Sequence, residues 1–419
     1  MNSKLSSLQS PGGNISSDVL PFVQTPWNII SNRAGSNFSM KKIFLIGLSF
    51  MVGSAALKAA DAPTITVSKN DAIAISVAPV AGPDGAMFTK VIQNDLALSG
   101  YFSVTTAANA AFIVSGAAGG GGLQGKVSEH GGQTALAKNY SGSGRSAAHQ
   151  FADDIIETLT GNKGFAGSKI AFVATRSGRK EIYTADYDGS NVQQLTRDNN
   201  ISVNPGLSPG GRKLVYTGYK SGYADIYLVD LANGARDRIV KFPGTNSGAA
   251  FSPDGGQLAC TLSKDGNPEL YVVNASGGAA RRLTHTSGVE SSPTWSPNGS
   301  EIIYSSDDRG TPQLYRISAS GGSGTLISTG FSYCTEPSWS PDGKKVAFSV
   351  RQGGFQIAVL DLQGGPARVL TSGERPSWGS DSRHLLFADG GALYLIDAQT
   401  SRKTRVLDGL GKITEPTWR

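Results

Sequence analysis

A short turn motif recurs through the second half of the chain at a fixed spacing. The segments LSPGG, FSPDG, WSPNG and WSPDG begin at positions 207, 251, 295 and 339, and a degenerate copy, WGSDS, begins at 378. Proline presets φ at the second turn position, Asp or Asn suits the third, and Gly accepts a positive φ at the fourth. A period of about forty residues indicates that one supersecondary unit is repeated along the chain.

Each copy continues with apolar strands that are separated by polar loops. One set of strands begins at positions 169, 213, 257, 301, 345 and 384, and a second set begins at 181, 225, 269, 313, 356 and 392. With an inner strand before the turn and an outer strand after the second set, each unit becomes a four-stranded sheet, which is the size of a β-propeller blade. Residues 165–419 are therefore predicted to form a six-bladed β-propeller.

The end of the chain predicts how this ring closes. The blade that starts at Lys169 has no inner strand before it, whereas the segment ITEPTW at 413–418 reads as an inner strand with no turn after it. We expect Trp418 and its neighbours to complete the first blade, because a strand edge at a terminus is normally paired or covered. An open solenoid is the alternative, and it would need a polar capping repeat at each end.

The segment before the repeats has a different pattern. Residues 61–164 predict a small α/β domain, with strands at 72–79 and 111–118 and helices marked by apolar stripes at helical spacing. The glycine-rich stretch at 116–144 is interpreted as a flexible hairpin, because no phosphate-binding motif occurs in it. The fold class is thus α+β multidomain: a small α/β domain followed by a mainly β propeller.

The first sixty residues predict export. Lys41 and Lys42 precede the apolar run Ile43–Gly53 and the small-residue stretch SAALKAA, which together are typical of a signal peptide at 40–60. Residues 1–39 are interpreted as a disordered extension upstream of the true start, Met40. The run is too short to span a bilayer, and no transmembrane segment is expected in the mature protein. Beyond residue 60 the chain has 33 basic and 31 acidic residues, which disfavours nucleic-acid binding.

Motifs for catalysis are weak throughout the chain. The segment Gly206–Gly210 matches the nucleophile-elbow pattern, but its Ser208 repeats at 252, 296 and 340 and is therefore interpreted as a turn residue. The four histidines lack the paired spacing of a zinc site and are expected on the surface or on strands. Cys260 and Cys334 fall in blades that are not adjacent, so two free, packed thiols are expected. No cofactor and no metal are predicted, although acidic loops could present oxygens to a cation in the channel.

Several segments carry a family resemblance. The inner strands TEPSW and TEPTW, the stretch LALSGYFSV at 96–104 and the junction AHQFADDIIETLTGNKGFAGSKIAFV at 148–173 resemble the TolB family of the Tol-Pal envelope system. The resemblance covers nearly all of residues 61–419. It implies a non-catalytic periplasmic protein that supports outer-membrane integrity and envelope constriction at cell division.

The resemblance also implies two protein partners. One is the peptidoglycan-associated lipoprotein Pal, bound through the propeller, and the other is TolA, bound through the mature N-terminal segment near Asp61–Lys69. The chain departs from the family pattern at 116–144, and Thr245 stands where the family often has His. A propeller that binds a small molecule or glycan, or a sensory propeller related to those of peptidases, remains the alternative function.

The site for Pal is expected on one side of the ring. The loops that lead into the inner strands converge around one channel mouth, and prolines at 293, 337 and 416 should stiffen them. Acidic groups there would suit a basic surface or a helix N-terminus of the partner. The predicted partner-binding residues are Thr245, Asn246, Glu290, Ser291, Glu336 and Glu415.

Overall fold

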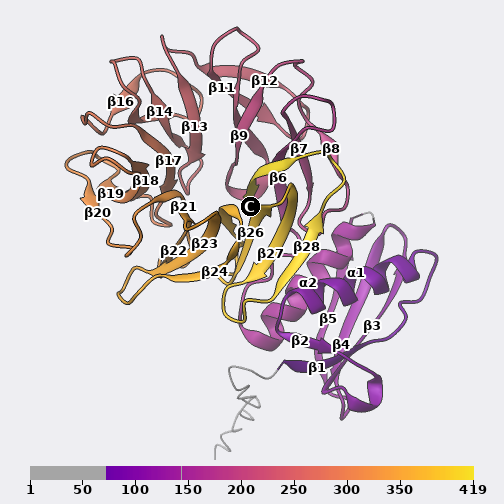
Figure 1. Ribbon diagram of the computed structural model, residues 1–419. Coiled ribbons are helices and arrows are strands. Elements are labelled where there is room, and N and C mark those ends of the chain that lie inside the picture. Colours follow the sequence, from indigo (N-terminus) through magenta and orange to yellow (C-terminus); the bar gives the residue numbers. More distant parts are fainter. Residues whose placement is uncertain (1–71, 143) are drawn as a thin grey trace, which may run out of the picture. The chain divides into compact units, whose positions relative to one another are not determined.

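A mixed sheet with two helices precedes the repeats in the computed structural model, which describes residues 72–142 and 144–419 (Figure 1). The predicted extension, signal peptide and segment Asp61–Lys69 lie outside the described residues. All described residues belong to one compact unit. In the part of the chain that the structure describes, no helix is both long enough and apolar enough to cross a membrane.

The first sheet has the strand order β2-β1-β3-β4-β5, in which β1 pairs with β2 and β3 in parallel and the later pairs are antiparallel. The elements of this region, which also contains a short 3₁₀ turn at 107–109, are β1 (Ile73–Val77), α1 (Gly85–Leu98), β2 (Phe102–Val104), β3 (Phe112–Gly119), β4 (Gly122–Glu129), β5 (Thr134–Ser141) and α2 (Arg145–Thr160).

The apolar stripes predicted for the two helices form the core of this region. Phe88, Ile92 and Leu96 of α1 pack in one cluster with Phe151 and Ile155 of α2, and all are buried. Each helix is followed by a glycine with a positive φ, Gly100 after α1 and Gly161 after α2, which suits the end of a helix.

The glycine-rich stretch contains the predicted hairpin and continues into a third strand. It forms the regular strands β3, β4 and β5, because Gly120 and Gly121 adopt positive φ values that suit a two-residue hairpin turn. A Cβ atom at Gly125 would lie 2.7 Å from the ring of Phe151, so this glycine allows α2 to approach the sheet closely.

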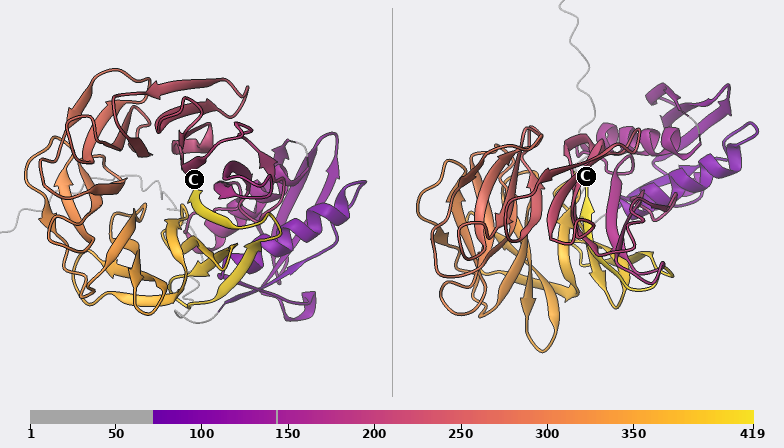
Figure 2. Two further views of the ribbon diagram at one scale, coloured as in Figure 1. Left: turned by 45° about the horizontal axis from the view of Figure 1, so that its top comes forward. Right: turned by 90° about the horizontal axis from the view of Figure 1, so that it is seen from above.

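Six four-stranded antiparallel sheets follow and surround a common axis (Figure 2). Blade 1 contains β29 (Ile413–Trp418), β6 (Lys169–Ala174), β7 (Glu181–Asp186) and β8 (Gln193–Gln194). Blade 2 contains β9 (Ser202–Leu207), β10 (Lys213–Gly218), β11 (Asp225–Asp230) and β12 (Arg236–Val240). Blade 3 contains β13 (Asn246–Phe251), β14 (Gln257–Leu262), β15 (Glu269–Asn274) and β16 (Ala280–Arg282).

The remaining three blades repeat this plan from the innermost strand outward. Blade 4 contains β17 (Glu290–Trp295), β18 (Glu301–Ser306), β19 (Gln313–Ser318) and β20 (Thr325–Leu326). Blade 5 contains β21 (Cys334–Trp339), β22 (Lys345–Arg351), β23 (Phe355–Asp361) and β24 (Arg368–Ser372). Blade 6 contains β25 (Glu374–Trp378), β26 (His384–Asp389), β27 (Ala392–Asp397) and β28 (Lys403–Leu407). The predicted fold class is confirmed, whereas the exact domain boundaries stay predictions.

The repeated turn is held by its serine as well as by its proline and glycine. The hydroxyl Oγ of Ser252 accepts a hydrogen bond of 2.9 Å from the backbone N–H of Gln257, where the next strand begins. The same bond occurs at Ser208, Ser296 and Ser340. Ser208 is therefore a structural turn residue, as its place in the repeat predicts.

The C-terminal strand closes the ring as predicted. Strand β29 pairs antiparallel with β6, so that Trp418 lies opposite Ile170. The Trp418 side chain is 1% exposed, and its indole N–H donates a hydrogen bond of 2.6 Å to Ser168 Oγ. Segments about 250 residues apart in the sequence thus form one blade, in which β29 covers the inner edge of β6.

Candidate functional site

Each inner strand is interrupted by a β-bulge at the same position. In all six blades the register between the innermost strand and the next strand shifts once. The residue at the shift has a positive φ between 51° and 63°, although only one of the six is glycine. These residues, here called the axis ring, are Asn204, Gly248, Ser292, Glu336, Arg375 and Glu415.

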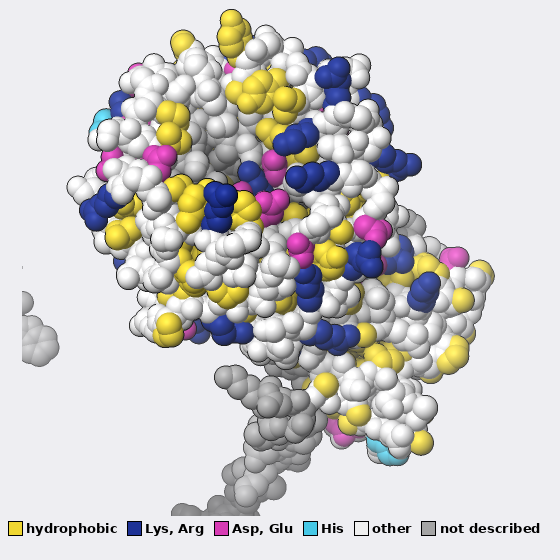
Figure 3. Space-filling view, in the orientation of Figure 1, with side chains coloured by type: hydrophobic (Ala, Val, Ile, Leu, Met, Phe, Trp, Pro, Cys, Tyr) yellow, Lys and Arg dark blue, Asp and Glu magenta, His cyan; other side chains and the backbone are white. Residues whose placement is uncertain are grey.

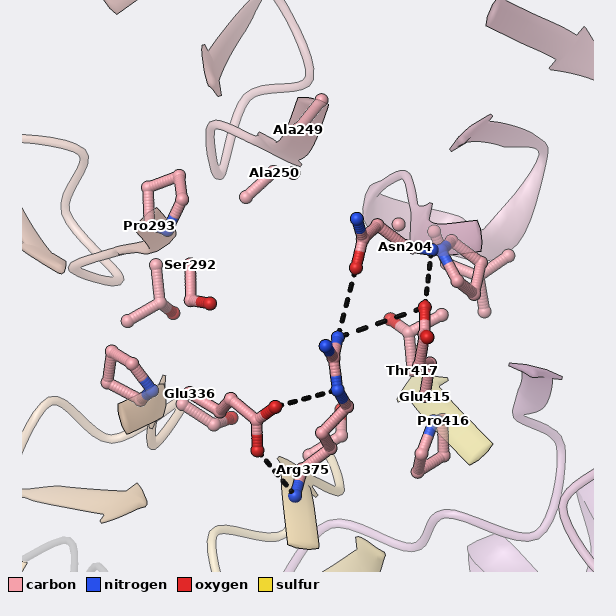
Figure 4. Close-up of a pocket in the computed structure, with 18 of the residues that line it drawn as sticks. Asn204, Ala249, Ala250, Ser292, Pro293, Glu336, Arg375, Glu415, Pro416 and Thr417 are labelled. Atoms are coloured by element: carbon pink, nitrogen blue, oxygen red, sulfur yellow. Dashed lines mark hydrogen bonds and ion pairs between the residues drawn. The ribbon is translucent and has the colours of Figure 1, made fainter. Parts of the chain in front are cut away.

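A proline follows the axis-ring residue in every blade except blade 3. Proline lacks an N–H group, and it is tolerated here because each innermost strand is the edge strand of its sheet and the bulge already interrupts the hydrogen-bond ladder. A bulge also bends the strand and redirects a side chain. The axis ring accordingly lines a cavity of about 170 Å³ at the centre of the propeller, and Figure 4 shows its side chains there.

Arg375 links charged and polar groups around the axis. Its Nε lies 2.7 Å from Glu336 Oε1, and its Nη1 donates a hydrogen bond of 3.0 Å to Asn204 Oδ1 (Figure 4). The same Nη1 lies 3.8 Å from Glu415 Oε2, which also accepts a hydrogen bond of 2.6 Å from the backbone N–H of Asn204. One guanidinium therefore connects four consecutive blades: 5, 6, 1 and 2.

Burial and ion pairing act in opposite directions on this network. Burial raises the pKa of Glu336 above its usual range, although the nearby Arg375 and a hydrogen bond from Ser349 lower it in part. For Arg375 burial favours the neutral form, but the carboxylates of Glu336 and Glu415 outweigh it and raise the pKa of the guanidinium. Arg375 is therefore the fixed positive charge of the axis ring.

The structure separates the six predicted partner-binding residues. Glu336 and Glu415 belong to the axis ring, Ser291 is half-buried beside Ser292, and Thr245 is exposed at the end of a loop. The expectation that all six surround the channel mouth is wrong for Asn246 and Glu290, whose side chains are buried.

The reason for this error is the register of the repeats. Asn246 and Glu290 are the first residues of β13 and β17, two positions before the bulge, where side chains point into the blade. The amide of Asn246 donates hydrogen bonds to the carbonyl oxygens of Ala224 and Phe242, and so fastens the loop from within.

Sequence reasoning missed Asn204, Ser292 and Arg375 as axis residues. A usable signal was present, because each stands directly before a proline and three residues before the Leu or Trp that precedes the repeated turn. Alignment of the repeats on that proline would have placed these residues in one ring with Glu336 and Glu415.

Glu290 instead forms a buried acidic pair with Glu269, and both side chains are 0% exposed. Glu290 Oε1 accepts hydrogen bonds from Thr286 and Ser306, and Glu269 Oε1 accepts one from Arg282. The Oε2 atom of each accepts none from the described groups. Burial, together with the neighbouring Glu269, raises the pKa of Glu290 to about 7, so Glu290 holds its proton more tightly than an ordinary glutamic acid.

We expect the variant Glu290→Gln to be more stable than the wild type at pH 8, because a Gln amide stays neutral and can donate to Glu269 at a pH at which Glu290 loses its proton. Glu290 binds its proton more tightly in the folded chain than at its ordinary pKa of 4.5. Its contribution to stability is therefore complete below pH 4.5 and is lost as the pH rises through about 7. Denaturant unfolding should show a gain of roughly 1–3 kcal/mol at pH 8 and little at pH 5.

The control is Glu157→Gln, which removes an exposed carboxylate from α2. Its effect should be small and should not change between the two pH values. A gain for Glu290→Gln that is equal at pH 5 and pH 8 would contradict the raised pKa of Glu290.

The loops on one side of the propeller carry exposed apolar side chains. We call the loops from the outermost strand of one blade to the innermost strand of the next the connecting loops; they are residues 195–201, 241–245, 283–289, 327–333, 373 and 408–412. The loops between the second and third strands open on the same side, because neighbouring strands are antiparallel. The backbone N–H of Tyr219 donates to the carbonyl of Ile201 between these two loop sets.

Four large hydrophobic side chains are exposed on this connecting-loop face. Tyr223 is 73% exposed, Ile201 and Val289 are each 44% exposed, and Phe355 is 37% exposed. They are four of the seven large hydrophobic side chains that are exposed among the described residues. This face therefore carries more than half of the exposed large hydrophobic side chains among the described residues, and exposed apolar surface of this kind favours interaction with another protein.

Charges on the propeller surface are mixed. Figure 3 shows one face on which Lys and Arg side chains alternate with Asp and Glu side chains and with hydrophobic ones. Such a mixture resembles ordinary protein–protein interfaces more than the uniformly basic surfaces that bind nucleic acid.

The prediction for the cysteines agrees with the structure, whereas the prediction for the histidines is wrong in one case. Cys260 and Cys334 are buried and free, as predicted. The expectation for the histidines is wrong for His149, which is buried on a helix rather than placed on the surface or on a strand. Helical periodicity alone did not show what would cover that side of α2.

Comparison with known proteins gives one consistent family. The family model described as "TolB beta propeller domain" matches residues 156–419. "Tol-Pal system protein TolB" of Geobacter sulfurreducens is 51% identical over 83 residues, which are 19% of this chain and 19% of that relative. "Protein TolB homolog" of Chlorobium chlorochromatii is 45% identical over 83 residues, again 19% of each chain. The matched stretch thus spans about a fifth of the length of these curated relatives.

The solved structures extend the likeness to both regions of the fold. The crystal structure of TolB from Acinetobacter baumannii matches with a TM-score of 0.76 at 26% sequence identity. The match covers 83% of this chain and 96% of that one.

Proposed function

The chain belongs to the TolB β-propeller family, and from this premise we propose that it is a non-catalytic periplasmic interaction component of a Tol-Pal envelope system. In this role it binds the lipoprotein Pal through the propeller and TolA through the segment near Asp61–Lys69. These contacts would support outer-membrane integrity and envelope constriction at division. The names of the curated relatives support the system as a whole, and the partners are our proposal.

The exposed apolar side chains of the connecting-loop face are the observation that carries the proposal. Tyr223 of blade 2 and Val289, in the loop that leads into blade 4, supply apolar contacts of the proposed interface, while Thr245 and Ser291 supply polar groups. Buried groups such as Asn246 hold these loops in place through hydrogen bonds. The loops therefore lose little conformational entropy when a partner binds.

The axis ring supplies the electrostatic part of the proposed site. Glu336 and Glu415 face the axis, and a basic side chain or a helix N-terminus of Pal would complement them. Asn246 and Glu290 act indirectly, by holding the loops. We propose no cofactor, because the guanidinium of Arg375 already supplies the positive charge that a channel cation would bring.

The axis cavity does not favour the alternative of a small-molecule or glycan receptor. Sites for such ligands usually enclose about 300–1,000 Å³, whereas this cavity measures about 170 Å³. The side chains of Glu336, Arg375 and Glu415 also bond to one another across it. A macromolecular partner on the surrounding loops fits this geometry better.

We expect the double variant Tyr223→Ser/Val289→Ser to bind Pal at least tenfold more weakly than the wild type, because it removes two apolar contacts from the proposed interface. Isothermal titration with the soluble, unacylated domain of Pal measures the dissociation constant. Both side chains are exposed, so the melting temperature should not change.

The matched control is Leu326→Ser, which removes a hydrophobic side chain that is 40% exposed on the outer strand β20. Its affinity for Pal should equal that of the wild type. Equal losses in the control and in the double variant, or no binding of Pal by the wild type, would contradict the proposed function.

A further inference from the structure

A second group of chemically active side chains lies where helix α2 meets the first blade. His149 of α2, Asp186 at the end of β7 and Asp188 in the turn that follows each place one potential ligand atom within 4.8 Å of the other two. The side chains of His149, Asp186 and Asp188 are only 4%, 8% and 5% exposed. Helix α2 and the turn therefore enclose a nitrogen and two carboxylates away from bulk water.

The imidazole of His149 is oriented by a further carboxylate. Its Nδ1 lies 2.6 Å from Asp95 Oδ2, and Asp95 Oδ1 accepts a hydrogen bond of 2.6 Å from the hydroxyl of Tyr187. With Nδ1 donating to Asp95, Nε2 is left as the nitrogen that can coordinate. This Nε2 is buried and has no hydrogen-bond partner among the described groups. A carboxylate that holds the far nitrogen of a histidine is the usual support of a metal-binding imidazole.

The two carboxylates of the cluster form ion pairs with basic side chains that are partly exposed to solvent. Asp188 contacts Arg145, whose side chain is 27% exposed, and Asp186 contacts Lys169, whose side chain is 53% exposed. The pairing is incomplete, because Arg145 Nε is itself buried without a partner. Both cations can turn toward solvent when another positive charge takes their place.

We propose that His149 Nε2, Asp186 and Asp188 bind one divalent transition-metal ion of the zinc class, with water as a further ligand. Imidazole nitrogen suits zinc, whereas calcium and magnesium prefer an all-oxygen shell. Zinc–ligand bonds of about 2.0–2.2 Å place ligand atoms no more than about 4 Å apart. Small side-chain rotations from the observed separations would complete the site.

Such an ion would fasten the α/β region to the propeller. His149 belongs to α2, and the two aspartates belong to blade 1. Bound metal would thus add a crosslink to the contact that Asp95 and Tyr187 already make between these regions. This role is independent of the proposed Pal site, which lies on the loops around the propeller axis.

The test is a titration of ZnCl2 into the metal-stripped full chain, with the variants His149→Ala and Asp188→Asn and the control His285→Ala. The histidine of the control is exposed on a connecting loop. We expect one zinc ion per wild-type chain, at least tenfold weaker binding in both variants, and no change in the control. Zinc should raise the melting temperature of the wild type and of the control, but not of Asp188→Asn.

Two further readouts identify the ligands. Co²⁺ in place of Zn²⁺ should give the visible absorption of a four-coordinate site in the wild type and not in Asp188→Asn, and Ca²⁺ in hundredfold excess should not displace it. Asp188→Asn keeps the shape of its side chain, so it remains informative if His149→Ala does not fold. Absence of zinc binding by the wild type, or binding that is equal in Asp188→Asn, would overturn the proposal and leave the cluster as a set of ion pairs between α2 and blade 1.

Discussion

Deletion of residues 414–419 is expected to lower the melting temperature by more than 15 °C or to prevent folding altogether. The deletion removes most of β29, the inner strand of blade 1, and withdraws Trp418 from the core. Loss of a buried Trp side chain alone costs about 3–5 kcal/mol, and whole domains are stable by only about 5–15 kcal/mol. Thermal unfolding followed by circular dichroism measures the effect.

Two substitutions at Trp418 separate packing from hydrogen bonding. Trp418→Phe keeps most of the apolar volume and loses only the bond to Ser168, so it should cost far less than Trp418→Ala. If the truncated chain melts within 2 °C of the wild type, the ring is not closed by this strand.

The second large effect is expected for Arg375→Met. This variant leaves Glu336 without its ion-pair partner at the axis, and removal of one member of a buried pair costs about 3–5 kcal/mol. The Arg375 side chain is 34% exposed to the channel, so water screens part of this charge. We therefore expect about 2–3 kcal/mol at pH 8.

The loss should depend on pH in a defined direction. Burial already raises the pKa of Glu336, and removal of Arg375 raises it further. A carboxyl whose pKa is raised in the folded state stabilises the fold below its unfolded pKa and loses that contribution as the pH rises. The free energy of unfolding of the variant should therefore equal that of the wild type near pH 4 and should become lower than it as the pH rises to 8.

Two other variants serve as comparisons. Arg375→Met/Glu336→Gln should recover part of the loss at pH 8, because it removes the unpaired carboxylate. Arg351→Met, which removes an exposed arginine at the end of β22, should change little. A loss in Arg375→Met that is the same at pH 4 and pH 8 would show that its cause is packing and not charge.

The architecture could be predicted from the sequence because its signals are local. Four of the turns combine Ser, Pro and Gly within five residues and recur every 44 residues, and a degenerate fifth copy begins at 378. Ring closure followed from one missing strand at Lys169 and one surplus strand at Trp418. The repeated turn and the unmatched strands can both be recognised in the sequence without knowing any tertiary contact.

The site was predicted only in part because its geometry depends on the bulges. Pairing with the next strand imposes a positive φ on Arg375 and Glu415. Neither arginine nor glutamate favours this conformation, so the residue types do not predict it. Asn246 and Glu290 precede the bulge in their strands, and their side chains point into the blade and not toward the predicted surface. His149 was misjudged for a related reason, because the turn at 186–188 that covers it lies almost forty residues further along the chain.

The most direct test of the proposed function is hydrogen–deuterium exchange of the full chain with and without the soluble domain of Pal. We expect slower exchange in the complex at 219–224, 241–246 and 284–290, and no change at the repeated turns 252–256 and 340–344 on the opposite side. Protection confined to those turns or to the α/β region, with the connecting loops unchanged, would contradict the assignment of the partner site.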